Sequence, residues 1–368
     1  MQEPQLPLRR IALSCLGSIG KHDHTLADLL QKEGVIDHGL ALLSHKDMLI
    51  RRQACRLLAL SIQHHDGAVD WITRPAREAL VETMKAADGT DGETGQFAAT
   101  LVQQLAKRSN SAAAQLRELG VVPLLVNHIA AAAAAPNAAS PMAAAAALGH
   151  ICDAVTDAAD AAVEHGAIGA LKGVLSSPDV RPHVCAVLCS AVAAIANAGD
   201  SHSATVARSG TLQAMADATL LSGRKMGPIA LGLARNGLSK AIAKCGDYHV
   251  LVGLMEKMPF GAGSGGGGGG GGEGGSGGGG EGGAAGGGEG EVAVLTALFK
   301  ALARLMSEKG SLRLNFMQRG ALTLAQQAKH SRSADLKEGL KALNSTYPNQ
   351  MVLATDNSYE KQLLDKIV

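Results

Sequence analysis

The stretch from Ala144 to Ile168, AAAALGHICDAVTDAADAAVEHGAI, carries the pattern that decides the fold. Ala144, Leu148 and Ile151 follow one another at spacings of four and three positions, upstream of Gly166. Such spacings place these aliphatic side chains along one face of a helix, which is the face that an amphipathic helix buries. Gly166 follows a polar stretch and precedes a second apolar segment. The stretch therefore predicts two packed helices joined at a glycine.

The same arrangement recurs along the chain. Five glycines each precede a small or aliphatic pair, and successive ones are separated by one or two repeat lengths of roughly 40–46 residues. The last interval fits this rule once the tract of glycines that it contains, near position 270, is removed. The same three positions before the glycine are aliphatic in all five copies, at Gly34, Gly120, Gly166, Gly210 and Gly320.

This periodicity predicts an all-α, armadillo-type α-solenoid, in which helical repeats stack into a superhelix. We expect about six repeats over residues 1–258, those at 51–84 and 226–258 being degenerate, because Ala76 and Ser61 break the pattern in the first of these. Two insertions interrupt the array, an Ala-rich one at 130–140 and a disordered Gly-rich linker at 259–290. A last repeat with a terminal helix should cover 291–348, and a C-terminal tail 349–368.

Composition excludes several classes of function. The formal net charge is only +1 and aromatic residues make up 2% of the chain, so neither electrostatic attraction nor base stacking favours a nucleic-acid partner. The start lacks the features of a signal peptide, and prolines interrupt the longest apolar run, so we expect no membrane partner. The six cysteines lie in apolar helical stretches and indicate reduced, buried thiols in the cytoplasm.

The chain shows no arrangement typical of catalysis. It has no P-loop lysine, nucleophile elbow or H-E-x-x-H motif, and glycine-rich matches inside the glycine tract follow from composition alone. Histidines at 22, 24, 64 and 65 stand where helices should end, and Cys185 and Cys189 are one helical turn apart, but solvated and buried roles explain these residues better than zinc binding does. We therefore expect no enzyme activity, no cofactor and no metal.

Two sets of residues are candidates for binding protein partners. The first set is basic and recurs at the start of successive long helices, where it could form a ladder suited to an acidic protein surface. The second set should face outward from the helix that follows each glycine. The first set is Arg9, Arg10, Arg51, Arg52 and Arg56, and the second is Asp37, His38, Asn127, Gln213, Asp217, Thr323 and Gln327.

Three segments resemble a known family. The start from Gln2 to Ala12, the Ile19-Gly-Lys-His22 that follows, and the close from Leu343 to Asn349 are similar to the sperm-associated-antigen armadillo proteins of the ciliary central apparatus. The tail, with Asn357-Ser-Tyr359 and Leu363-Leu-Asp365, is similar as well. The resemblance implies a non-enzymatic armadillo solenoid on a central-pair microtubule, here as a divergent or N-terminally shortened member.

The leading hypothesis is thus a structural scaffold of the axonemal central apparatus in cilia or flagella, located in the cytoskeleton. Its partners would be tubulin and other central-apparatus proteins, with end-to-end self-association made plausible by an apolar first helix. An importin-like transport adaptor is an alternative, although such adaptors use regularly spaced Trp and the chain holds only Trp71. A regulatory scaffold subunit of an enzyme complex is the other alternative.

Overall fold

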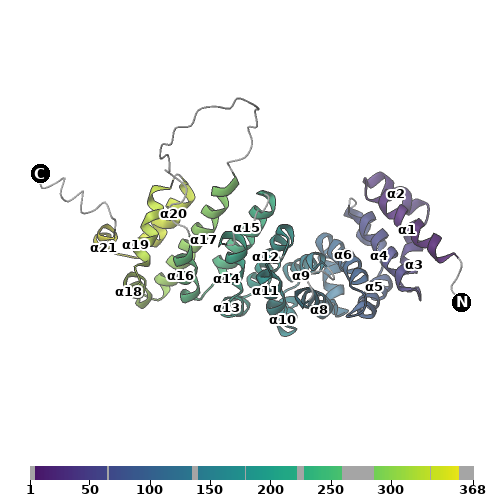
Figure 1. Cartoon of the computed structure of the whole chain (residues 1–368), viewed down its shortest axis with the longest axis horizontal. Helices are drawn as coiled ribbons and strands as arrows, with labels where there is room; N and C mark the ends of the chain where they lie inside the picture. Colours follow the sequence, from purple (N-terminus) through teal and green to yellow (C-terminus); the bar gives the residue numbers. More distant parts are fainter. Residues whose placement is uncertain are drawn as a thin grey trace, which may run out of the picture. The chain divides into compact units, whose positions relative to one another are not determined.

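A computed structural model of the chain describes residues 5–63, 66–134, 140–178, 180–221, 228–258, 286–331 and 333–355, which are helices and the turns between them (Figure 1). Within these ranges the structure holds no strand. The chain divides into two compact units, with the boundary between His202 and Ser203 inside helix α13 (Asp200–Arg208). The prediction of an all-α, armadillo-type fold is confirmed.

Unit 1 is a stack of long helices that we call main helices, each packed against the next (Figure 1). They are α1 (Leu6–Gly20), α4 (Met48–Ile62), α6 (Gly92–Arg108), α9 (Met142–Ala154) and α12 (Pro182–Asn197). Second helices lie beside them, namely α3 (Val35–Leu42), α5 (Arg74–Ala87), α8 (Val121–Ala134) and α11 (Ala167–Ser176).

Unit 2 repeats the arrangement. Its main helices are α15 (Pro228–Lys244), α17 (Gly286–Glu308) and α20 (Ala334–Asn344), and α17 packs against both of the others. Its second helices are α14 (Thr211–Ala216), α16 (Tyr248–Lys257) and α19 (Ala321–Gln326). The remaining elements are a π-helical turn η2 (Asp217–Leu221), α18 (Ser311–Gln318), a 3-10 turn η3 (Gln327–His330) and α21 (Asn349–Ala354).

The recurring glycine has the backbone conformation that the repeat requires. All five predicted glycines have φ between +69° and +80°, in the left-handed region that residues with a Cβ rarely adopt. Each one ends the preceding helix, as in Gly166, whose N–H bonds the carbonyl of Val163 at 3.0 Å. The second helix then begins directly after the glycine, so the glycine sets the angle between the two helices.

The polar stretch before each glycine is itself a short helix, which corrects the expectation of two helices per repeat. These helices are α2 (His24–Lys32), the 3-10 turn η1 (Asp66–Trp71), α7 (Asn110–Glu118), α10 (Ala158–Glu164), α13 and α18. The sequence pattern missed them because they bury few side chains; α7, for example, buries only Ala112, Ala113 and Leu116. Polar caps start several of them, as Ser109 does by accepting a bond from the N–H of Ala112.

The aliphatic stripe is buried in four of its five copies. Around Gly166, for instance, Ala144, Leu148 and Ile151 are all fully buried. In the first copy Ala12 is exposed and Ile19 is 42% exposed, so the prediction of burial is wrong there. The reason is that α1 has a neighbouring main helix on one side only, namely α4.

The two insertions fall where second helices end and main helices begin. The Ala-rich segment at 130–140 extends α8 to Ala134, and residues 135–139 lie outside the described residues. Most of the predicted Gly-rich linker, residues 259–285, also lies outside them, whereas α17 already begins at Gly286. Of the C-terminal tail, α21 and Thr355 are described and residues 356–368 are not.

A search of the described residues for membrane spans finds no single helix that is both long and apolar enough. One pair, α7 with α8, passes the test of length and composition when taken together, and it is bent by 83° at the break between them.

The glycine rule gives a stability prediction with an internal control. Gly166→Ala places a Cβ on a residue at φ +80°, whereas Gly169→Ala changes a residue inside α11, and neither new Cβ would meet an atom within 4 Å. We expect Gly166→Ala to lower the free energy of unfolding by about 1–2 kcal/mol. Gly169→Ala should leave it unchanged or raise it by about 0.5–1 kcal/mol. Urea denaturation of both variants measures the difference, and equal midpoints would contradict the rule.

Candidate protein-binding surfaces

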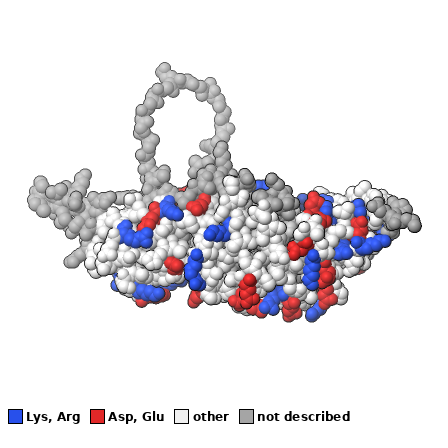
Figure 2. All heavy atoms as spheres, turned by 60° about the horizontal axis from the view of Figure 1, so that its bottom comes forward, with Lys and Arg blue, Asp and Glu red and all other residues white. Residues whose placement is uncertain are grey.

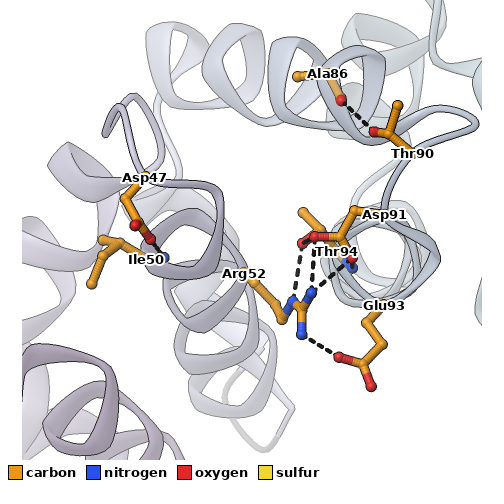
Figure 3. Close-up of polar contacts among 8 residues, drawn as sticks. All are labelled: Asp47, Ile50, Arg52, Ala86, Thr90, Asp91, Glu93 and Thr94. Atoms are coloured by element: carbon orange, nitrogen blue, oxygen red, sulfur yellow. Dashed lines mark hydrogen bonds and ion pairs between the residues drawn. The ribbon is translucent and has the colours of Figure 1, made fainter. Parts of the chain in front are cut away.

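Arg52 joins two repeats in unit 1 through the best-connected polar cluster of the predicted basic set. It reaches from α4 to the start of α6, as Figure 3 shows, where its Nη2 lies 2.8 Å from both carboxylate oxygens of Asp91. Its Nε donates to Thr94 Oγ1 at 3.1 Å, and its Nη1 pairs with Glu93. Asp91 also caps α6 by accepting from the N–H of Thr94. One carboxylate thus holds a helix start and a neighbouring repeat together.

Arg10 makes the equivalent contact one repeat earlier in the sequence. Its Nη2 lies 2.8 Å from Asp47, which caps α4 through the N–H of Ile50. Burial alone would raise the pKa of both Asp47 and Asp91. Hydrogen bonds from Arg10 and Ile50 outweigh this effect at Asp47 and hold its pKa below the usual range. Hydrogen bonds from Arg52 and Thr94 do the same at Asp91.

Unit 2 contains a third contact of this kind. The Nη2 of Arg235, a side chain only 6% exposed on α15, lies 2.9 Å from Glu291 in the first turns of α17. The three acids share one register, because Asp47, Asp91 and Glu291 each stand at the same distance in sequence before the glycine position of their repeat, which is Ala76, Gly120 and Gly320 in turn. We call these three pairs the repeat clamps.

The other members of the basic set also have partners inside the protein. Arg56 donates to Ser14 Oγ at 2.6 Å and lies over the ring of Phe97, while Arg51 donates to the carbonyl of His45. Arg9 takes part in an interaction as well. The structure therefore brings the arginines to successive main helices, as expected, and Arg10, Arg52 and Arg56 bond residues of a neighbouring repeat. Their contact with a partner stays a prediction.

The second predicted set lies on the second helices and the turns after them, in both units. Asp37, His38, Asn127, Asp217 and Gln327 are exposed, and Gln213 and Thr323 are half-buried. Asn127 donates to Asp88 at 2.9 Å and Gln213 to Asp217 at 2.7 Å. The helix register thus placed these side chains at or near the surface, and their role in binding remains untested.

Sequence reasoning missed an open depression of about 610 Å³ in unit 2. It runs along α17 between Ala243 of α15 and Asp335 of α20, over a floor of small residues. Its polar edge includes Lys300, paired with Glu338 at 2.9 Å, and Arg304, which donates to the carbonyl of Cys245 at 3.0 Å. A long groove with a small-residue floor and a charged rim suits a segment of polypeptide.

Charge is mixed over the surface. On the face drawn in Figure 2, basic and acidic side chains alternate among the described residues, and neither sign dominates a large area. No group of three or more metal-binding side chains occurs among the described residues, and His64 and His65 lie outside them. Five of the six cysteines are buried, and burial raises the pKa of Cys55 to about 12.

Comparison with known proteins identifies the fold. No protein-family model and no curated protein matches the chain. Among solved structures, an engineered protein is similar over 94% of this chain and 76% of its own, with 16% identity and a TM-score of 0.67. A computationally designed armadillo repeat protein for modular peptide recognition is similar over 64% of this chain and 94% of its own, with 20% identity and a TM-score of 0.52.

A third similar structure is a designed armadillo repeat protein in complex with the peptide (KR)4, with 17% identity, a TM-score of 0.53, and coverage of 66% of this chain and 95% of its own. At these identities the likeness establishes the armadillo-type fold.

The repeat clamps predict where unit 1 is sensitive to mutation. Arg52→Met leaves the carboxylate of Asp91 without its main partner. Because the side chains of Arg52 and Asp91 are only 16% and 21% exposed, we expect the free energy of unfolding to fall by about 1–3 kcal/mol. Arg74→Met is the control, because Arg74 is 61% exposed and pairs with Glu78 on its own helix; its cost should stay below about 0.5 kcal/mol.

The same pair gives a pH test. Because the folded protein lowers the pKa of Asp91, its carboxylate adds stability above the pKa of the unfolded chain, and this stability is lost as pH falls through the folded pKa. Urea midpoints of the native chain should therefore drop between about pH 5 and pH 3, and the drop should be smaller in Arg52→Met. Equal slopes in the two proteins would show that the clamp does not set this pKa.

Proposed function

We propose that the chain is a non-enzymatic scaffold that binds protein segments across its main helices. The observation that carries this proposal is the depression along α17, which is open, floored by alanines and bordered by Lys300, Arg304 and Asp335. Of the similar designed proteins, one was made for modular peptide recognition and another is in complex with a peptide, and both support the same mode of action.

We further propose that this scaffold works in the central apparatus of motile cilia or flagella, with tubulin and neighbouring axonemal proteins as partners. The support is the sequence resemblance of the segments at 2–22 and 343–365. Mixed surface charge is consistent with a short-range, protein-specific contact rather than with general attraction to polyanions.

Fractionation of a motile flagellate tests the location. A tagged copy of the full chain should remain in the detergent-insoluble axoneme and should be lost from axonemes that lack the central pair. Release of the tagged chain with the detergent-soluble fraction would rule out the axonemal proposal. The scaffold proposal would then depend on whether the depression along α17 binds a partner.

The groove is tested by filling it. Ala293→Trp places a large ring in the depression at an exposed position, and Leu314→Trp, at a residue 60% exposed on α18, is the matched control. In co-sedimentation with microtubules or with axonemal extract, Ala293→Trp should weaken binding by about five-fold or more. If both variants bind as the native chain does, the groove is not the binding surface.

Self-association at the α1 end is a separate proposal. Leu8, Ile11 and Ile19 of α1 are 69%, 61% and 42% exposed, and Leu29 of α2, which packs against α1, is 50% exposed. These positions form an apolar surface on one side of α1, and a second copy of the chain could cover it. Ala12 and Cys15, both exposed, supply small side chains in the middle of that surface.

Cys15 makes this proposal easy to check, since it is the exposed cysteine of the six. A short bis-maleimide should cross-link the native chain into a dimer through Cys15, whereas Ile11→Glu, with a charge on the apolar surface, should give monomer only. Cys15→Ser is the control for the site of reaction. A native chain that stays uncross-linked at about 100 µM, where even a weak interface would be occupied, would refute self-association through this surface.

A further inference from the structure

The interface between α17 and α20 keeps the acid of a repeat clamp and lacks the arginine. Arg10 and Arg52 stand at one fixed distance in sequence before the glycine position of their repeats. At the same distance before Gly320 stands Thr296, on α17. The next main helix, α20, nevertheless carries Asp335 in its first turn. This interface therefore has a carboxylate of the kind that the clamps use, without the cation.

Two interfaces in unit 1 that lack the arginine lack the acid as well. The position of Arg52 is taken by Gln96 in α6 and by Met142 in α9. The main helices that follow these two, α9 and α12, have no acidic residue at the N-cap or in the first turn. In the stack from α1 to α12, the arginine and the acid are thus both present or both absent, whereas α17 and α20 have only the acid.

The depression along α17 lies at this place. Its volume is about 610 Å³, and both Thr296 and Asp335 line it. Small side chains leave the space open, since Ala293 and Ala297, one helical turn apart on α17, line it too. At the position of Ala297, α6 carries the much larger Phe97. The depression is therefore open where the clamps place an arginine side chain.

The carboxylate of Asp335 is available to a ligand. Asp335 is exposed, and it makes no hydrogen bond or ion pair with another residue that the structure describes. Glu338, one turn later, is already paired with Lys300 at 2.9 Å. At the opposite edge, Arg304 donates to the carbonyl of Cys245. A ligand that reaches the α20 edge without breaking an existing pair thus meets a negative charge.

We propose that the depression binds one arginine side chain of a partner segment, which completes the clamp from outside; this inference rests on the proposed scaffold function and specifies its ligand. The alkyl stem lies over Ala293 and Ala297, and the guanidinium pairs with both carboxylate oxygens of Asp335. Lysine lacks the planar fork for that pair. Because Lys300 and Arg304 stand along the same face of α17, a run of cations is repelled, and the arginine is flanked by neutral residues.

A short peptide tests the ligand chemistry on the full chain. The probe has one arginine between alanines and glycines, with blocked ends, and its binding is followed by saturation-transfer NMR. We expect a dissociation constant on the order of 1 mM, as befits so small a ligand. Replacing the arginine by citrulline keeps the shape and removes the charge, so binding should weaken about three- to five-fold. A peptide with glutamate in its place should bind more weakly still.

Two aspartates supply matched variants. Asp335→Asn removes the charge at the depression and should weaken binding of the arginine peptide about three- to five-fold, while leaving the citrulline peptide unchanged. Asp200→Asn is the control, since Asp200 is also exposed and also lies in the first turn of a helix, α13, away from the depression. It should bind both peptides as the native chain does.

Thr296→Arg supplies the arginine from the chain itself. The new side chain should occupy the depression, pair with Asp335 and abolish peptide binding. Thr296→Met fills the same space without a charge and should block the peptide as well. The urea midpoint of Thr296→Arg should exceed that of Thr296→Met, and this difference should vanish when Asp335→Asn is added to both.

Four results would overturn the arginine proposal: equal binding of the arginine and citrulline peptides, tighter binding of the glutamate peptide, no binding of any peptide up to about 5 mM, or native binding of the arginine peptide by Asp335→Asn. The scaffold proposal is judged separately. An axonemal partner that Ala293→Trp releases would support the scaffold even if arginine plays no part in the contact.

Discussion

The structure depends on one packing constraint, the burial of small and aliphatic side chains between neighbouring main helices. Gly149 of α9 shows how tight this contact is, because a Cβ built there would lie 3.3 Å from the Cα of Ala191 on α12. Such close approach explains why the core is made of Ala, Leu, Val and Ile with few aromatics. The left-handed glycine before each second helix then fixes the turn that lets the next pair stack in the same way.

This packing constraint leaves few places for polar groups between repeats. The repeat clamps occupy such places. Each clamp joins an arginine of one main helix to an acid before or within the first turns of the next. In the two clamps of unit 1 the acid, Asp47 or Asp91, also caps that helix, so the ion pair supports a helix terminus. The sequence alone could not separate this role from a surface ladder, because Arg10 and Arg52 recur with the repeat in both cases. Only the position of Asp47 and Asp91 decides between them.

Local pattern was enough to predict the helices that bury a stripe, since Leu148 and Ile151 recur at fixed distances from Gly166. It failed where burial depends on a neighbour, as at Ile19 of α1, and where a helix buries little, as in α7. The binding surfaces were harder still. Thr296 and Lys300 define a groove only because α15 and α20 lie beside α17, and that arrangement leaves no mark in the sequence around them.

In a repeat protein, function is best sought where one copy breaks a rule that the others keep, because packing already explains the residues that follow the rule. His128 and Gly95 break it together, and each is costly without the other: the imidazole would clash with a Cβ at residue 95, and glycine there would leave a larger void without the imidazole. Two exceptions that compensate each other in one repeat make an accidental loss of packing a poor explanation. Aligning the repeats of one chain by their glycines thus locates a paired departure from the repeat that the overall fold alone does not indicate.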